Sequence, residues 1–298
     1  PLSSKTTFIE LTSTFGVDQL RAFNEKLLLR YGELRMEVQS QRAVYDISFL
    51  TTVTTLKVRH LQKCAFVIPT NVVQLYLENF TSQVTVSGTE NLTYLAIPNK
   101  SIRTAACPKL QQLQLTGEVL SEEMLPCPFS EMPTLSCMDV EVKNIDPTFR
   151  FPAQLTSLTL KARDGCVNNP LLMPLTSLQR LDLIVMKASD PLDLSGLTML
   201  TWLNTCELPV LQLPSSLVTC FISLQSDTNL SVLTRLSSLY VSAKPDIRVT
   251  FPTGLKELRI NTIEVANTNI GDVSLEVFEL WDRHITRTDL EKLPKTLC

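Results

Sequence analysis

A six-residue phrase recurs along this 298-residue chain at intervals of 17 to 25 residues. It has an apolar residue, two variable ones, Leu, one variable, and then Leu, Ile or Val. The twelve copies begin at Val53, Val72, Leu92, Leu110, Leu135, Leu155, Leu178, Leu200, Leu217, Leu236, Leu255 and Leu275. Thr205 and Cys220 stand where aliphatic residues are due, so two copies are imperfect. Such spacing over most of a chain indicates stacked structural repeats.

The alternation inside the phrase predicts a short β-strand. Because successive side chains of a strand point to opposite faces, the paired aliphatic residues face inward and the residues between them face outward. One repeat cannot bury its own aliphatic pair, but stacked copies cover each other. The sequence therefore predicts one continuous solenoid.

Residues 51–298 resemble the leucine-rich repeat family through this L-x-x-L-x-L core, as at Leu110, Leu113 and Leu115. The resemblance implies an α/β horseshoe class, rich in β, with a parallel concave sheet of about 12 short strands. The phrase at 213–217, Leu-Pro-Ser-Ser-Leu, is similar to the short repeats of bacterial leucine-rich effector proteins and of protist proteins.

The convex side is expected to depart from the family pattern. The family usually places Asn or Cys at the ninth position of the repeat, whereas this chain has residues such as Leu61, Phe80 and Lys100 there. Repeats this short leave little room for helices. We therefore expect mostly irregular, extended or 3₁₀ segments behind the sheet.

The first fifty residues are expected to form a separate cap. Apolar residues of 18–37 fall near helical spacing, which predicts an amphipathic helix over about 18–37. A solenoid end needs a polar cover, although a helix that binds a partner is the other interpretation. At the opposite end, Leu293 and Pro294 repeat the opening of the phrase shortly before Cys298, so the last repeat is expected to be truncated and its parent longer.

The residue inventory argues against catalysis, metals and cofactors. His60 and His284 are the only histidines and lie far apart in the array, and none of the eight glycines forms a phosphate-binding loop. The eight cysteines include no C-x-x-C pair. The sequence thus predicts no enzyme and no cofactor.

Composition sets the expected partner class. A net charge of −3 argues against nucleic acid, and no run of eighteen apolar residues predicts a membrane span. Scattered cysteines favour a cytoplasmic location, while N-x-Ser/Thr sequons leave secretion or the cell surface open. The sequons begin at Asn79, Asn91, Asn99 and Asn229.

The repeat register identifies an exposed face made by the third, fifth and seventh positions. These 36 positions include both Trp residues and three of the five Tyr, but only one of the twelve Phe. Trp and Tyr recur as interface anchors because they bury a large area and keep a polar group. The candidate partner-binding residues are Trp202, Phe221, Tyr240, Trp281, Tyr76, Tyr94, Arg180 and Asp182.

Two interpretations of this enrichment remain. Aromatic residues favour strands and stack across neighbouring strands, which requires no partner. Alternatively, the face binds a protein or peptide, and the chain is a non-catalytic interaction scaffold of undetermined oligomeric state. A secreted or surface-exposed pathogen binding protein, and the recognition arm of a larger enzyme, are the alternative functions.

Overall fold

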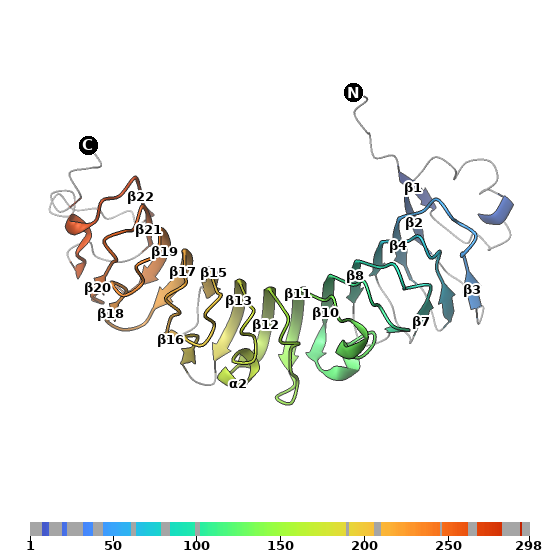
Figure 1. The fold of residues 1–298 in the computed structure, drawn as a ribbon, viewed down its shortest axis with the longest axis horizontal. Coiled ribbons are helices and arrows are strands. Elements are labelled where there is room, and N and C mark those ends of the chain that lie inside the picture. The colour runs from blue at the N-terminus through green and yellow to red at the C-terminus, as the bar shows by residue number, and fades with distance from the viewer. Residues whose placement is uncertain are drawn as a thin grey trace, which may run out of the picture. The chain divides into compact units, whose positions relative to one another are not determined.

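The computed structural model describes residues 8–11, 20–22, 32–37, 44–60, 64–78, 84–98, 102–188, 191–205, 210–244, 246–261, 267–281 and 293. The chain divides into two compact units, Pro1–Phe149 and Arg150–Cys298. Each unit is a coil of parallel strands (Figure 1). Within the described ranges, no helix has the length and apolar character needed to cross a bilayer.

Unit 1 carries seven described strands in its main sheet, all parallel. Their order in space follows the sequence: β1 (Phe8–Leu11), β2 (Glu33–Glu37), β4 (Thr55–Arg59), β6 (Gln74–Glu78), β8 (Tyr94–Pro98), β10 (Gln112–Leu120) and β11 (Cys137–Ile145). Leu56 pairs with Leu75, Leu75 with Leu95, and Leu95 with Leu113. All four are fully buried, so the fourth position of each phrase builds one continuous core column.

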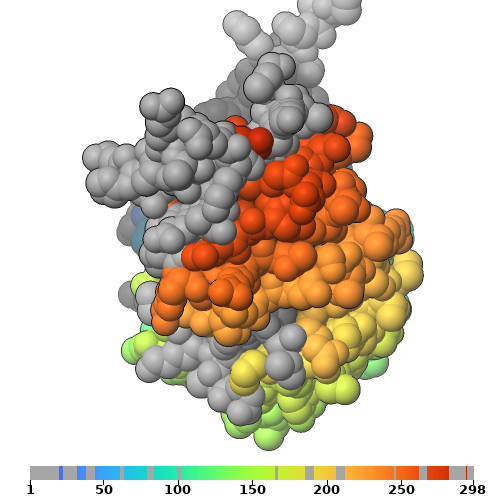
Figure 2. Space-filling model, turned by 90° about the vertical axis from the view of Figure 1, so that its left-hand side faces the viewer, coloured from blue at the N-terminus to red at the C-terminus, as the bar shows by residue number. Residues whose placement is uncertain are grey.

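Unit 2 repeats this arrangement with seven described strands in its main sheet. They are β12 (Ser157–Val167), β13 (Arg180–Ala188), β15 (Trp202–Thr205), β17 (Thr219–Leu224), β19 (Ser238–Ala243), β21 (Glu257–Asn261) and β22 (Val277–Leu280). The repeats lie one upon the next, and Figure 2 shows their surfaces as successive bands from yellow to red. Cys220 pairs with Leu203 and Leu239 and is buried, so it fills its Leu position in the core.

The back of each unit is also partly strand. In unit 1, β3 (Val44–Asp46), β5 (Ala65–Val67), β7 (Val84–Ser87) and β9 (Ile102–Thr104) form a second parallel sheet, followed by the 3₁₀ turns η2 (Glu122–Met124) and η3 (Phe129–Glu131). Unit 2 has the pairs β14 (Leu192–Asp193) with β16 (Val210–Gln212) and β18 (Thr228–Asn229) with β20 (Val249–Thr250), the helix α2 (Asn169–Leu172) and the 3₁₀ turn η5 (Ile270–Asp272). The predicted fold class is confirmed, with a more regular back than expected in unit 1.

Side-chain hydroxyl groups at the second position of the phrase donate hydrogen bonds to the preceding repeat. Thr93 Oγ1 donates to the Val73 carbonyl at 3.4 Å, and Ser237 Oγ donates to the Val218 carbonyl at 3.2 Å. The same carbonyls accept two backbone N–H groups from the next repeat, as Val73 O does from residues 93 and 94. Asn71 adds a 2.6 Å bond from Nδ2 to Val53 O. These contacts satisfy the backbone groups where each turn enters its strand.

The helix predicted over about 18–37 is wrong over its last five residues. Residues 20–22 are helical, but Glu33–Glu37 is strand β2, paired with β4. Leu34 and Met36 are buried, whereas Glu33, Arg35 and Glu37 are partly exposed, which is the two-residue period of a strand. With Tyr31 in the first position this segment is another copy of the phrase, so main-sheet strands begin before residue 51. The residues of the predicted helix between 23 and 31 lie outside the described residues.

Candidate functional site

A row of four aromatic side chains crosses the exposed face of the unit 2 sheet. We call Trp202, Phe221, Tyr240 and Trp281 the aromatic row. The ring centroids are 5.7 Å apart for Trp202 and Phe221, and 5.8 Å for Phe221 and Tyr240. Tyr240 and Trp281 meet edge to face at 5.6 Å. All three contacts lie in the distance range of favourable aromatic pairs, each worth about 1 kcal/mol beyond simple burial.

Strand register explains how the row forms. Phe221 and Tyr240 are direct partners on β17 and β19, while Trp202 pairs with Thr219 and reaches Phe221 diagonally. The row therefore shifts from the third position of one repeat to the fifth of the next. Direct and diagonal neighbours are the two kinds of cross-strand contact open to large side chains.

Trp281 reaches the row across an intervening strand. Arg259 of β21 is the direct partner of Tyr240, but its guanidinium is drawn to two carboxylates. Nη2 lies 2.8 Å from Glu257 Oε1 and Nε lies 3.4 Å from Glu279 Oε2. The backbone N–H of Trp281 donates to Ile260 O at 3.0 Å and extends the ladder beyond β22. This backbone position lets the Trp281 indole contact the Tyr240 ring.

Arg180 and Asp182 lie at the other end of the row, on β13. The guanidinium of Arg180 sits 3.5 Å from the ring centre of Trp202, a cation–π contact. Asp182 Oδ1 accepts a 2.9 Å hydrogen bond from Asn204 Nδ2. The structure thus brings six predicted residues of unit 2 into one connected strip: Arg180, Asp182, Trp202, Phe221, Tyr240 and Trp281.

Three large apolar side chains remain exposed on this face. The exposed fraction is 58% for Trp281, 50% for Ile184 and 42% for Val277. Ile184 occupies a seventh position on β13 and Val277 a third position on β22, at opposite sides of the strip. The other members of the aromatic row are only partly exposed, since their faces are turned toward each other. Solvent therefore contacts parts of the aromatic rings and the aliphatic side chains of Ile184 and Val277.

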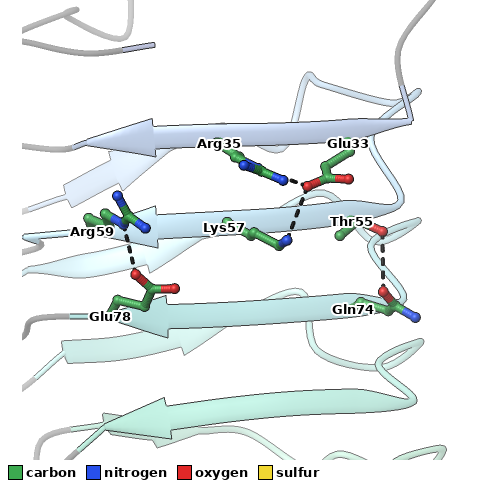
Figure 3. Close-up of polar contacts among 7 residues, drawn as sticks. All are labelled: Glu33, Arg35, Thr55, Lys57, Arg59, Gln74 and Glu78. Atoms are coloured by element: carbon green, nitrogen blue, oxygen red, sulfur yellow. Dashed lines mark hydrogen bonds and ion pairs between the residues drawn. The ribbon is translucent and has the colours of Figure 1, made fainter. Parts of the chain in front are cut away.

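The exposed face of unit 1 carries polar pairs within one strand and between neighbouring strands. Glu33 Oε1 lies 3.0 Å from Arg35 Nε and 3.2 Å from Lys57 Nζ, and Arg59 Nε lies 2.7 Å from Glu78 Oε2 (Figure 3). Burial alone would raise the pKa of Glu33, but the hydrogen bonds and charges of Arg35 and Lys57 outweigh it, and the pKa is lowered. These carboxylates and cations satisfy each other.

Tyr76 and Tyr94 are in contact beside this polar group, as the register predicts. Their ring centroids are 4.8 Å apart, and Lys57 Nζ lies 4.9 Å from the ring centre of Tyr76. The Tyr94 hydroxyl donates to Gln114 Oε1 at 2.6 Å. Burial, with the nearby Tyr76 and Asp139, raises the pKa of Tyr94. The Tyr76 ring therefore contacts Tyr94 and Lys57, and the Tyr94 hydroxyl is hydrogen-bonded within the protein.

The histidine positions hold no metal-binding or catalytic constellation within the described part of the chain. His60 directly follows β4 and lies in the left-handed backbone region, with φ of 60°, and its Nε2 lies 3.9 Å from Glu37 Oε1. No group of three or more His, Cys, Asp or Glu side chains suited to a metal occurs there. His284 lies outside the described residues.

Sequence reasoning missed two features of this face. It placed Ile184 and Val277 on the face without selecting them, because neither residue type marks an interface by itself. It also separated Trp281 from Tyr240, because the two are two residue positions apart in register across β21. The intervening Arg259 and its two carboxylates were the available signal, since an ion-paired side chain lies down along the sheet.

The fold and its face define a leucine-rich repeat solenoid. No family model and no curated protein matches the sequence. Among solved structures, the chain is similar to TLR13 in its complex with ssRNA13, with 14% identity, a TM-score of 0.51, and coverage of 92% of this chain and 46% of that one. This likeness shows the shared fold.

Other similar structures are leucine-rich repeat proteins too. One is CroV588, a circular leucine-rich repeat protein, with 14% identity, a TM-score of 0.41, and coverage of 86% of this chain and 44% of that one. Another is LIC12759 of Leptospira interrogans, with 15% identity, a TM-score of 0.45, and coverage of 88% and 82%. The chain spans less than half the length of CroV588 and of TLR13.

Proposed function

We propose that the protein is a non-catalytic scaffold that binds a protein or extended peptide on the exposed sheet face of unit 2. The observation that carries this proposal is the aromatic row with Ile184 and Val277 exposed beside it. Exposed apolar side chains grouped on one face mark interaction sites more often than single scattered ones do. Aromatic rings held in place by neighbours lose little conformational entropy on binding.

The size of the strip suits a polypeptide. Six strands from β13 to β22 span about 24 Å at roughly 4.8 Å per strand. Its charges have both signs, with Arg180 and Arg259 beside Asp182, Glu257 and Glu279. A nucleic acid requires a net basic surface to neutralise its phosphates. The single-stranded RNA in the TLR13 structure therefore serves as a comparison ligand, expected to bind this chain weakly or not at all.

The proposal is tested with variants that alter exposed residues and spare the buried core. Ile184→Ser with Trp281→Ser removes two exposed apolar side chains from the exposed sheet face of unit 2. Met199→Ser with Val232→Ser is the matched control, because these residues are 53% and 67% exposed and lie away from the third, fifth and seventh positions. Both double variants should give the far-ultraviolet circular dichroism spectrum of the wild type.

Capture from a lysate of the source organism is then compared for the three proteins. The proposal expects a protein retained by the wild type and by the Met199/Val232 control but lost from the Ile184/Trp281 variant. Purified partner should also change the fluorescence of the wild type, since its only two Trp residues are in the aromatic row. Equal retention by all three proteins would contradict binding on this face.

The cytoplasm is the compartment we propose, and secretion is the competing one. Asn229 is exposed and lies in a sequon, so it is accessible for a glycan. Asn91 is a poorer acceptor, because its Nδ2 donates to Thr70 O at 2.8 Å and its Oδ1 accepts from Lys109 Nζ at 2.6 Å. Mass spectrometry of the native protein that finds a glycan on Asn229 would overturn the cytoplasmic assignment.

A further inference from the structure

The indoles at the two ends of the aromatic row differ in what lies beside them. At one end, the guanidinium of Arg180 is 3.5 Å from the ring centre of Trp202. At the other end, Trp281 is 58% exposed, and no Lys or Arg of the described residues lies over its ring. Its indole N–H donates to Glu279 Oε2 at 3.3 Å. One indole therefore has a cation beside it, and the other has a carboxylate.

The two carboxylates near Trp281 are not equally satisfied. Glu257 Oε1 lies 2.8 Å from Arg259 Nη2, and its Oε2 accepts from Ser238 Oγ at 2.9 Å. Glu279 has longer contacts, both on Oε2, with Trp281 Nε1 at 3.3 Å and with Arg259 Nε at 3.4 Å, the second of which is no hydrogen bond. Glu279 Oε1 has no partner among the described residues. A carboxylate accepts hydrogen bonds on both oxygens, so Glu279 can accept one from a ligand.

This end of the strip also carries an excess of negative charge. Glu257 and Glu279 share the single guanidinium of Arg259, while Lys256 and Glu276 neutralise each other at 2.9 Å. An apolar group laid on Trp281 would remove water from Glu279 without giving it a partner, and an acidic group would meet a like charge. A cation avoids both costs.

We propose that a Lys or Arg side chain of the bound polypeptide lies against the indole of Trp281 and donates a hydrogen bond to Glu279 Oε1. This contact rests on the polypeptide binding proposed for unit 2, and it defines one chemical feature of the partner. Trp is the most favourable ring for a cation, and a hydrogen bond from a charged donor to a carboxylate is stronger than a neutral one. Arg180 and Trp202 already form the same kind of contact within the chain.

The probe is a phage-displayed library of random peptides, selected on the immobilised intact chain. Peptides about 12 residues long suffice, because the strip of about 24 Å takes up roughly seven extended residues at ~3.4 Å each. Selected peptides that change the Trp emission of the wild type are kept as binders of the face, since both Trp residues belong to the aromatic row. We expect these peptides to share a Lys or Arg at one position.

The affinity of such a peptide is then compared with that of the same peptide carrying norleucine in place of its basic residue. The wild type should prefer the basic peptide about tenfold, from an exposed cation–π contact and an exposed ion pair together. In Glu279→Gln the preference should fall to about threefold, the share of the cation–π contact. Glu276→Gln is the matched control, because it removes the same charge from the second position of the same repeat, outside the strip, and it should keep the full preference.

The outcomes separate this contact from the binding face itself. Face-binding peptides that lack a basic residue, or a wild-type preference below about twofold, would overturn the contact and leave the face intact. The same conclusion would follow if Glu279→Gln left the preference unchanged, or if Glu276→Gln lowered it equally. If no selected peptide changes the Trp emission, binding on this face is contradicted and the contact falls with it.

Discussion

Gly88 is a position where the repeat geometry tolerates little change. It follows β7 with φ of +86°, a conformation that L-residues adopt at a cost of about 1 kcal/mol or more. A Cβ built there would lie 2.3 Å from Ile68 O and 3.2 Å from Ile68 Cγ1. Ile68 is itself fixed by its N–H bond to Ser87 O at 3.0 Å, in the ladder that joins β5 and β7.

Gly88→Ala should therefore destabilise unit 1 by about 3 kcal/mol. Relief of the contact requires the two backbones to separate by roughly 0.7 Å, an overpacking cost of about 1–3 kcal/mol that adds to the backbone cost. Gly196→Ala is the matched control, because a Cβ there meets no atom within 4 Å and no positive φ is involved. It should be neutral or stabilising by a few tenths of a kcal/mol, on the order expected for an unstrained Gly to Ala change.

Urea unfolding followed by circular dichroism measures both variants against the wild type. Hydrogen exchange of the 65–68 and 84–88 segments localises the effect, which should be faster exchange in Gly88→Ala alone. If both variants lie within about 0.5 kcal/mol of the wild type, the close approach of Gly88 to Ile68 O is wrong and so is the register of the back sheet.

Three further changes test other parts of the structure. Thr205 is fully buried and its Oγ1 has no hydrogen-bond partner among the described residues. Thr205→Val should therefore raise the free energy of unfolding, measured in urea, by about 1 kcal/mol. A loss of stability would mean that the hydroxyl is paired. Burial raises the pKa of Cys220 from 9.0 to about 12, so above pH 9 the folded state keeps the thiol proton and the unfolded state loses it. The free energy of unfolding of the wild type should therefore fall between pH 9 and about 12 more steeply than that of Cys220→Ala. Parallel pH profiles of the two proteins would refute this. Phe221→Leu should cost about 1–2 kcal/mol and change the Trp emission spectrum, because Phe221 contacts both Trp202 and Tyr240; an unchanged spectrum would show that the row is not stacked.

The repeat phrase predicted the main sheet well because it carries both the strand period and the repeat spacing. Its fourth position aligns in the structure as the core column of each unit, including the imperfect copy with Cys220. The copy around Leu34 and Met36 was missed, since charged residues and Leu residues nearby also fit a helical period. Two apolar residues two positions apart cannot decide between the two periods without the strand beside them.

Side-chain hydrogen bonds between repeats occur at the entry to the strand and not at the ninth position of the repeat, where the family pattern led us to look for them. Absence of Asn at the ninth position predicted irregular turns, whereas Thr93, Ser237 and Asn71 supply side-chain bonds just before and within the strand entry. Ser and Thr are common at exposed positions, so the pattern carries little weight until the acceptor carbonyls are known. The candidate binding strip followed from the register, but the contact of Trp281 with Tyr240 across β21 was not predicted from it.

Site-specific photocrosslinking tests the central claim that unit 2 binds a polypeptide on its exposed sheet face. A photoreactive phenylalanine derivative is placed at Trp281 in one protein and at Val232 in another, and both are irradiated in the source lysate. Binding on the strip predicts a defined protein adduct from position 281 that Ile184→Ser weakens, with none from position 232. An adduct from position 232 alone, or the same adducts from both positions, would contradict the claim.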